Sequence, residues 1–421
     1  MTLALLLFGL MYILLLSLPK YRPQIALGTA FLFVILGILP IKKVIPAINF
    51  NVILMLAGMM MLVQLFISSN MPTLVAEKLL KITANVKWAI VVLSLFAGLV
   101  SAFIDNVATL LMISPIGISI AKKLKINPVP VIISIAVSSN LQGAATLVGD
   151  TTSILLGAYT KMNFNDFFIY HGKVSIGIAT EVGALLTIPV LLFLFRHEKE
   201  KVSVKAITKV TNYIPTILLL GVIFSLIIAS QVPNLPSLTN GFICLFFAFV
   251  ALLYEIMWQR NKKAIKQCLQ AIDYKTLLLL SGLFIVIQGI NEAGVIKAMA
   301  NLFSIFGGHN LLLVYVLVVF ISVVISAFVD NIPYVATMLP VMQKVAFNMA
   351  IDPTILYFGL LIGATLGGNL TPIGASANIT GIGILNSEGY EVKTSDFMKI
   401  GIPYTLVAVL AGSIFIWLIW H

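Results

Sequence analysis

Charged residues and cysteines are both scarce in this sequence, and each shortage excludes a class of protein. Only 10% of the 421 residues are charged, whereas 60% are hydrophobic, and the mean hydropathy is +1.09. A soluble domain carries roughly 25% charged residues, so this chain cannot cover a water-facing surface. The two cysteines, Cys244 and Cys268, form neither a metal-ligand cluster nor a disulfide framework. Apolar runs of membrane-spanning length recur from end to end, which indicates an integral membrane protein.

The first apolar run, 2–18, lacks the basic n-region and the small-residue cleavage site of a signal peptide. We therefore expect it to be a retained span. The net charge of +11 would suggest nucleic acid in a soluble protein. Here the Lys and Arg residues fall in short loops, where they set orientation and meet anionic headgroups. We expect membrane lipid as a partner and no nucleic acid.

The apolar pattern predicts an all-α polytopic membrane protein with about ten crossings. Eight of them are uninterrupted spans, near 2–18, 24–39, 48–67, 174–195, 212–230, 238–257, 274–291 and 400–420. Two longer apolar regions are interrupted by Gly, Pro, Asn, Asp and Thr. In each we predict a re-entrant helical hairpin followed by a crossing helix that is broken within the membrane.

The first of these regions is predicted to hold a hairpin over 88–121 and a broken helix over 128–158, with the hairpin tip at Asp105-Asn106. The second is predicted to hold a hairpin over 310–349 and a broken helix over 354–385, with its tip at Asp330-Asn331. The breaks are expected around 143–153 and 368–378.

The chain repeats itself at a separation of 225 residues. The matched positions are Ser-Ala-Phe-Ile-Asp-Asn at 101–106 with Ser-Ala-Phe-Val-Asp-Asn at 326–331, Gly143 with Gly368, Thr146 with Thr371, and Gly149 with Gly374. Chance matches between apolar helices would fall on Leu, Ile and Val, not on Asp, Asn, Gly and Thr. Each half has five crossings, an odd number, so the second copy must be inverted. We predict two inverted repeats, 1–200 and 212–421, joined by a cytoplasmic linker, 201–211, as in secondary transporters.

The distribution of basic residues predicts the orientation. Along the predicted crossings, six of the 26 Lys and Arg residues fall on one side and 20 on the other. The richer side includes the runs 122–125, 196–209 and 260–275. By the positive-inside rule that side is cytoplasmic, which leaves both termini extracytoplasmic. The count does not test the hairpins, because a hairpin and two full spans return the chain to the same side.

The tips and breaks form the candidate binding site, at the interface of the two halves. Helices that begin at Asn106 and Asn331, and near Thr152 and Ala377, should aim their N-termini at it, which suits an anion. The candidate substrate- and ion-binding residues are Asp105, Asn106, Thr109, Gly143, Thr146, Gly149, Asp150, Thr151, Thr152, Ser153, Asp330, Asn331, Asn369, Thr371, Gly374, Ser376 and Asn378.

The ionisable residues expected at membrane depth are Asp105, Asp150, Asp330 and Glu181, with no Lys, Arg or His inside a span. An ionisable group at depth is a functional hypothesis by default, because it is costly to keep there. The competing interpretation is that Asp105 and Asp330 only cap helices. Carboxylates, hydroxyls and freed carbonyls are ligands of hard cations, so Asp105, Asp150 and Asp330 are candidate Na⁺ ligands. Apart from Na⁺ or H⁺ as a coupling ion, no cofactor is expected.

These motifs resemble the signatures of the ion transporter superfamily, most closely its arsenite-pump and melanosomal P-protein branch. The first signature lies over 105–115 and 143–150, and the second is Gly-Gly-Asn-Leu-Thr-Pro-Ile-Gly-Ala-Ser-Ala-Asn at 367–378. The resemblance implies a fold with hairpins and broken helices, and members often dimerise. It also implies substrates such as arsenite or antimonite, carboxylates or sulfate, or Na⁺ and H⁺ alone. Members usually follow the first Gly-Asp with Pro-Pro-Asn, whereas this chain has Thr-Thr-Ser at 151–153.

The predicted function is secondary active transport by alternating access in a prokaryotic cell membrane, not enzymatic catalysis. The substrate is an anion or metalloid oxyanion, arsenite-like or a small carboxylate, coupled to Na⁺ or H⁺. Both cysteines lie outside the site, so capture of arsenite by a thiolate is not expected. A sodium/proton antiporter is the alternative, since no buried base is expected, and a passive channel is a third interpretation. An intramembrane aspartyl protease would need no duplication. A homodimer or a partner ATPase stays open.

Overall fold

The computed structural model describes residues 1–124, 126–201, 208–210, 212–261, 263–308 and 310–421. Within them the chain forms twenty α-helices, five short 3₁₀ turns and one two-stranded ribbon. The prediction of an all-α membrane protein is confirmed. Of the predicted linker, 202–207 and 211 lie outside the described residues.

The first half of the chain contains the elements α1 (Thr2–Ser17), η1 (Pro19–Tyr21), α2 (Arg22–Ile35), η2 (Ile41–Lys43), α3 (Val44–Ala47), α4 (Phe50–Ser68), α5 (Met71–Lys81), α6 (Val86–Ser101), α7 (Asn106–Leu124), α8 (Pro128–Gln142), η3 (Gly143–Ala145), α9 (Thr151–Thr160), η4 (Asn165–Phe167), β1 (Ile169–Tyr170), β2 (Lys173–Val174) and α10 (Ile176–Leu194).

The second half contains the elements α11 (Ile214–Ala229), α12 (Thr239–Met257), α13 (Ala264–Ala271), α14 (Tyr274–Glu292), α15 (Val295–Gly307), α16 (Leu311–Ser326), α17 (Asn331–Met349), α18 (Thr354–Gly367), η5 (Gly368–Leu370), α19 (Ser376–Ser387) and α20 (Thr394–Trp420).

The duplication extends to the side chains that start equivalent helices. Asn85 accepts a hydrogen bond from the amide of Trp88 at 3.1 Å at the start of α6, and Asn310, 225 residues later, does the same for Leu313 at the start of α16. Asn49 caps α4, and Asp273, 224 residues later, caps α14. Each such cap is worth about 0.5–2 kcal/mol, so the two copies begin their helices by the same local chemistry.

Two predicted features recur at matching places in both halves. Helices α6 and α7 occupy 86–124, and α16 and α17 occupy 311–349, where the two hairpins were predicted. The segment α8–η3–α9 is interrupted between 143 and 150, and α18–η5–α19 between 368 and 375. Each interruption leaves several residues without helical hydrogen bonds in a buried part of the chain.

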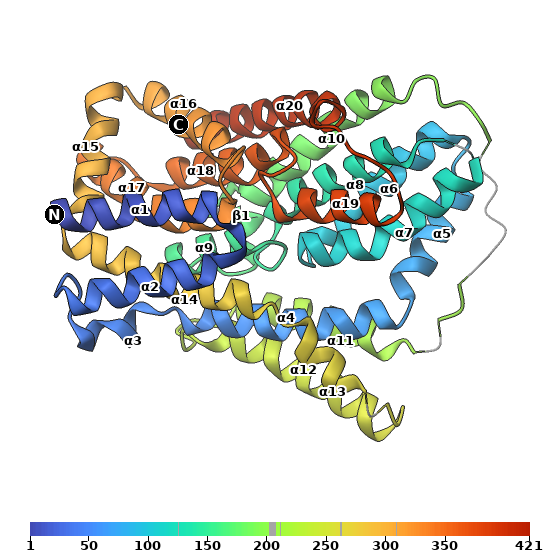
Figure 1. Cartoon of the computed structure of the whole chain (residues 1–421), viewed down its shortest axis with the longest axis horizontal. Helices are drawn as coiled ribbons and strands as arrows, with labels where there is room; N and C mark the ends of the chain where they lie inside the picture. Colours follow the sequence, from blue (N-terminus) through green and yellow to red (C-terminus); the bar gives the residue numbers. More distant parts are fainter. Residues whose placement is uncertain (125, 202–207, 211, 262, 309) are drawn as a thin grey trace.

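The helices form two layers (Figure 1). We call α6–α10 with α16–α20 the core, and α2, α4, α11, α12, α13 and α14 the scaffold. The hairpin α6–α7 lies towards the right-hand end of the view and α16–α17 towards the left-hand end, as inverted copies require. Amides of Val86 and Lys87 donate to carbonyls of Glu200 and Glu198 at 2.9 and 3.0 Å, so the base of the first hairpin adjoins the central loop.

Close helix crossings hold the scaffold together at equivalent glycines. A Cβ on Gly58 would lie 2.6 Å from backbone atoms of Cys244 and Leu245, and one on Gly282 would lie 2.7 Å from the carbonyl carbon of Ala26. Glycine permits such close approach of two backbones. Thus α4 packs on α12 and α2 on α14, and each scaffold pair joins one half to the other.

The structure places α1 and α2 differently from the prediction. They form a pair bent by 118°, whereas separate crossings were predicted over 2–18 and 24–39. With 16 and 14 residues, each helix is shorter than the roughly 20 residues of a full crossing. Among the described residues, six helices are long and apolar enough to cross a membrane, or up to eight when each of two bent pairs counts as one span. The figure of ten crossings stays a prediction.

Candidate functional site

In the first half, the hairpin tip is joined directly to the interrupted helix. The hydroxyl of Thr146 donates to the carbonyl of Ala102, just before the tip. A Cβ on Gly149 would lie 2.6 Å from the carbonyl oxygen of Gly143 and 2.7 Å from that of Ala102. Glycine is therefore required at 149 because three backbone segments meet there.

The second half repeats this junction residue for residue. The hydroxyl of Thr371 donates to the carbonyl of Ala327. A Cβ on Gly374 would lie 2.5 Å from the carbonyl oxygen of Gly368 and 2.8 Å from that of Ala327. These residues position the site through the backbone, which explains why their spacing is duplicated.

Both tip aspartates cap the second arm of their hairpin. One carboxylate oxygen of Asp105 accepts from the amides of Val107 and Ala108 at 3.0 and 3.2 Å, and one of Asp330 accepts from Ile332 at 3.2 Å. The second oxygen of Asp330 also forms an ion pair with Nη1 of Arg22 at 2.8 Å. The expectation of no basic residue at depth was wrong for Arg22, which the prediction had placed in a cytoplasmic loop.

Asp150 begins α9 and connects the two halves. Its carboxylate accepts from the amide of Thr151 at 2.7 Å and from the hydroxyl of Thr152 at 2.9 Å. The side-chain amide of Asn331, at the other tip, approaches it at 3.5 Å. The residue 225 positions later is Ala375, so this carboxylate has no counterpart in the second half.

A chain of amides crosses the interface between the halves. Asn106 donates to Asn140 at 2.9 Å, and Asn140 donates to the side chain of Asn369 at 3.0 Å and to the carbonyl of Thr365 at 2.9 Å. Asn369 in turn donates to the carbonyl of Val137 at 2.9 Å. All of these side chains are buried, so the network fixes how the two interrupted helices cross.

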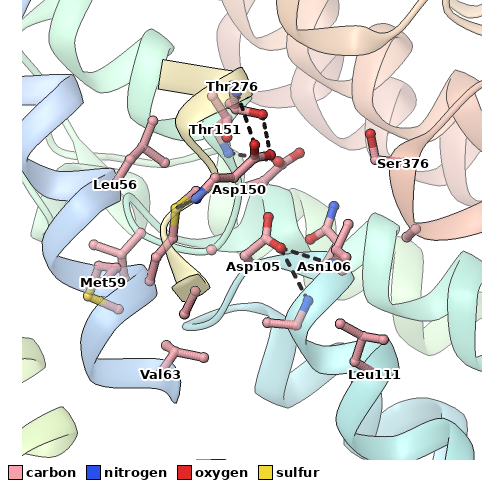
Figure 2. Close-up of a pocket in the computed structure, with 18 of the residues that line it drawn as sticks. Leu56, Met59, Val63, Asp105, Asn106, Leu111, Asp150, Thr151, Thr276 and Ser376 are labelled. Atoms are coloured by element: carbon pink, nitrogen blue, oxygen red, sulfur yellow. Dashed lines mark hydrogen bonds between the residues drawn. The ribbon is translucent and has the colours of Figure 1, made fainter. Parts of the chain in front are cut away.

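A cavity of about 420 Å³ lies where the tips and breaks of both halves meet the scaffold. The first residues of four helices line it, namely Asn106 of α7, Thr151 of α9, Asn331 of α17 and Ser376 of α19. Figure 2 shows Asp105 and Asp150 turned towards this space, opposite Leu56, Met59 and Val63 of α4. Its size is typical of a site for a small molecule.

The cavity carries negative side chains only. Asp105, Asp150 and Asp273 line it, and no Lys, Arg or His is found among its described lining residues. Asp273 accepts at 2.6 Å from the hydroxyl of Thr276, so it faces the cavity from the scaffold while the other two face it from the core. Neither Asp105 nor Asp150 takes part in an ion pair with any described residue.

Seven of the predicted site residues line the cavity and ten lie behind it. Those at the cavity are Asp105, Asn106, Gly149, Asp150, Thr151, Asn331 and Ser376. Those behind it are Thr109, Gly143, Thr146, Thr152, Ser153, Asp330, Asn369, Thr371, Gly374 and Asn378. Ser153 and Asn378 donate to the carbonyls of Gly143 and Gly368 at 3.4 and 2.9 Å, so they hold the breaks in shape.

The sequence analysis missed the scaffold side of the cavity. Gln64, Gln270, Asp273 and Thr276 line it, as does Asn140 from the core. The match of Gln64 with Gln288 was a usable signal. Asp273 lies at the end of a basic loop and gave none. Within the described residues, no three His, Cys, Asp or Glu side chains form a group that could hold a metal ion.

A family model described as "CitMHS: Citrate transporter" matches residues 12–363. The chain belongs to this family. A "46 kDa membrane protein" of Mycobacterium leprae is 31% identical to it over 380 residues, covering 88% of this chain and 86% of that protein. An uncharacterized transporter of Mycobacterium tuberculosis is 29% identical over 412 residues, covering 94% of each chain. This CitMHS chain is thus an integral membrane transporter and not an enzyme.

The resemblance to the P-protein branch is confirmed. The human P protein is 26% identical over 460 residues, which cover 89% of this chain and 54% of the P protein. Among solved structures, the YdaH transporter of Alcanivorax borkumensis matches with a TM-score of 0.60 at 14% identity, covering 89% of this chain and 86% of YdaH. MtrF of Neisseria gonorrhoeae matches with the same TM-score and identity, covering 82% of MtrF. At this identity the likeness shows the fold alone.

Proposed function

We propose that this CitMHS chain is a secondary active transporter that carries a small anion or metalloid oxyanion together with Na⁺ or H⁺ by alternating access. One observation carries the proposal: four helix N-termini, two from each inverted half, converge on a single cavity that three carboxylates also line. Inverted repeats that supply broken helices to a shared site are the general design of secondary transporters.

The charges of the cavity explain why a coupling cation is needed. Each helix N-terminus carries roughly half a positive charge, so four supply roughly two charges against three carboxylates. An anion that entered alone would add negative charge to a buried site that already has an excess, which is strongly unfavourable. Na⁺ or H⁺ bound at Asp105 and Asp150 would remove that excess and leave the helix N-termini free to bind the anion.

The substrate classes left open by the sequence fit this balance to different degrees. Citrate, named in the family description, is a polycarboxylate and would require several neutralising cations. Arsenite in its neutral form, As(OH)₃, would require none and would use the hydroxyl and amide groups of Thr151, Ser376, Asn106 and Asn331. Both buried cysteines lie elsewhere, in α12 and α13.

The sodium/proton antiporter remains the alternative function, and the three cavity carboxylates without a basic partner favour it. In that case the carboxylates are the whole mechanism and the helix N-termini only shape the cavity. The two functions differ in whether cation movement requires a second solute.

Purified protein in proteoliposomes separates them. Uptake of radiolabelled citrate and of arsenite is measured with and without inward gradients of Na⁺ and H⁺, and internal pH is followed with a trapped dye. The proposal expects uptake of one of these solutes that rises with a cation gradient. Na⁺-driven pH change with neither solute present, and no uptake of either, would instead establish the antiporter. Liposomes containing Asp150→Asn serve as the matched control.

The orientation is also a proposal. Both termini are expected outside the cell and the loop 196–209 in the cytoplasm, because of the distribution of Lys and Arg. Single cysteines placed at 2 and at 198 can be labelled in intact cells with a membrane-impermeant maleimide. Labelling at 198 and protection at 2 would reverse the orientation. Pairing with a second copy or with an ATPase stays a prediction.

A further inference from the structure

The two hairpin tips have the same backbone role but different electrostatic surroundings. Asp105 and Asp330 each use one carboxylate oxygen to cap a helix. The other oxygen of Asp330 is bound by Arg22 at 2.8 Å and by the hydroxyl of Ser376 at 3.3 Å. Asp105 lines the cavity and takes part in no ion pair with a described residue.

The chain around Arg22 is built to keep the guanidinium at the second tip. The bend between α1 and α2 places Arg22 at the first turn of α2, where its Nε also donates to the carbonyl of Leu15 at 3.3 Å. Tyr12 of α1 donates to the carbonyl of Pro333 at 2.7 Å and bonds the hydroxyl of Thr337 at 2.8 Å, which fixes α1 on α17. The side chains of Arg22 and Asp330 are only 18% and 8% exposed.

We propose that Arg22 is a tethered cation, which fills at Asp330 the place that a dissolved cation takes at the equivalent Asp105. The duplicated fold offers two tip carboxylates, but only the one without an arginine needs a cation from solution. This inference rests on the proposed function and deepens it: coupling cations bind in the first half only, at Asp105 and Asp150. Arg22 thereby limits how many cations accompany each substrate.

The chemistry of arginine suits this role. A guanidinium keeps its charge throughout the physiological pH range and is covalently held, so Asp330 stays neutralised in every pH and salt condition. A bound Na⁺ or proton exchanges with solution and can therefore couple transport to a gradient. Buried carboxylates must be compensated in one of these two ways.

The test counts cations bound by the purified full-length protein in detergent. Bound ²²Na⁺ per chain is measured by equilibrium dialysis, and bound protons are measured in parallel by potentiometric titration of the same samples. Arg22→Gln is expected to bind one cation more per chain than wild type, as Na⁺ or as a proton. Arg22→Lys and the double variant Arg22→Gln with Asp330→Asn are expected to show the wild-type count.

A second pair of variants keeps the test decisive if Arg22→Gln does not fold. Asp330→Asn should leave the cation count unchanged, whereas Asp105→Asn should lower it by one. Equal counts in Arg22→Gln and wild type, or equal losses in Asp330→Asn and Asp105→Asn, would overturn the inference. Because the assay measures cation binding without any anion, failure of citrate or arsenite uptake in proteoliposomes is a separate result that bears on the proposed function alone.

Discussion

The two halves of this transporter share their backbone design and differ in charge. In both, a threonine hydroxyl and a glycine join the hairpin tip to the interrupted helix, at Thr146 and Gly149 and again at Thr371 and Gly374. In the first half, however, two carboxylates face the cavity without a basic partner. In the second, Ala375 replaces one carboxylate and Arg22 pairs with the other. Duplication therefore preserved the residues that shape the breaks, while the residues that carry charge diverged.

The largest effect is expected from Asp150→Asn, which removes the carboxylate that the second half lacks. An amide keeps the shape of the α9 cap but loses the charge, and charge-assisted hydrogen bonds are worth about 1.5–3 kcal/mol. Cation-driven uptake in proteoliposomes should fall by roughly 10- to 100-fold, since 1.4 kcal/mol is a factor of ten. The thermal melt should stay near that of wild type. Normal uptake with unchanged Na⁺ and pH dependence would show that Asp150 is structural.

The converse substitution, Ala375→Asp, sharpens the comparison. It gives the second half the carboxylate of the first, at a buried position with no described cation nearby except Arg22, which already serves Asp330. We expect a lower melting temperature that added Na⁺ or acid partly restores. A melt equal to wild type in choline buffer at alkaline pH would contradict this.

The next effect separates the two tip aspartates. Serine caps a helix about as well as aspartate, so Asp105→Ser should change the free energy of unfolding by less than about 1 kcal/mol. Asp330→Ser leaves Arg22 without its partner, and breaking a buried pair costs about 3–5 kcal/mol. Denaturation in detergent should therefore show a clear loss for Asp330→Ser only. Equal stability of the two variants would mean that the ion pair contributes little.

Substitution of the duplicated glycines should affect both halves alike. Gly149→Ala and Gly374→Ala would each force a Cβ to within 2.8 Å of backbone oxygens, and we expect a cost of about 1–3 kcal/mol in each. Gly28→Ala is the control, because no atom lies within 4 Å of the added carbon and helix propensity then favours alanine. If only one of the two site variants is destabilised, the equivalence of the junctions is wrong.

The smallest effect is expected from the paired threonines. Thr146→Val and Thr371→Val each leave a buried carbonyl without its donor, at a cost of about 1 kcal/mol that should be the same in both halves. Thr29→Val provides the control, because its hydroxyl bonds the carbonyl of Ile25 within its own helix, where the backbone supplies another donor. Melting temperatures measured side by side would reveal an unequal pair.

Prediction from the sequence worked where the repeat itself carried the information. The tips at Asp105 and Asp330 and the break glycines stood out because polar residues recur at one spacing in otherwise apolar helices. The helix starts at Asn106 and Asn331 followed from the aspartates that precede them, since aspartate is a strong cap.

The sequence could not place residues whose role depends on tertiary packing. Arg22 lies between two apolar runs, which is typical of a loop, and only the bend between α1 and α2 places it at Asp330. Asp273 likewise follows a basic segment, and its contribution to the cavity depends on how α14 packs against the core. Nothing in the spacing of Asn140 marks it as the residue that links the two halves.

The junctions between tip and break also constrain how the protein can move. Because a hydroxyl bond and a glycine contact fasten each tip to the interrupted helix beside it, neither hairpin can swing open without tearing its own junction. The amide chain through Asn140 and Asn369 fastens the halves of the core to each other as well. The four helix N-termini should therefore travel as one rigid body, and a bound solute would ride with them past α4 and α14. What slides is the seam between core and scaffold.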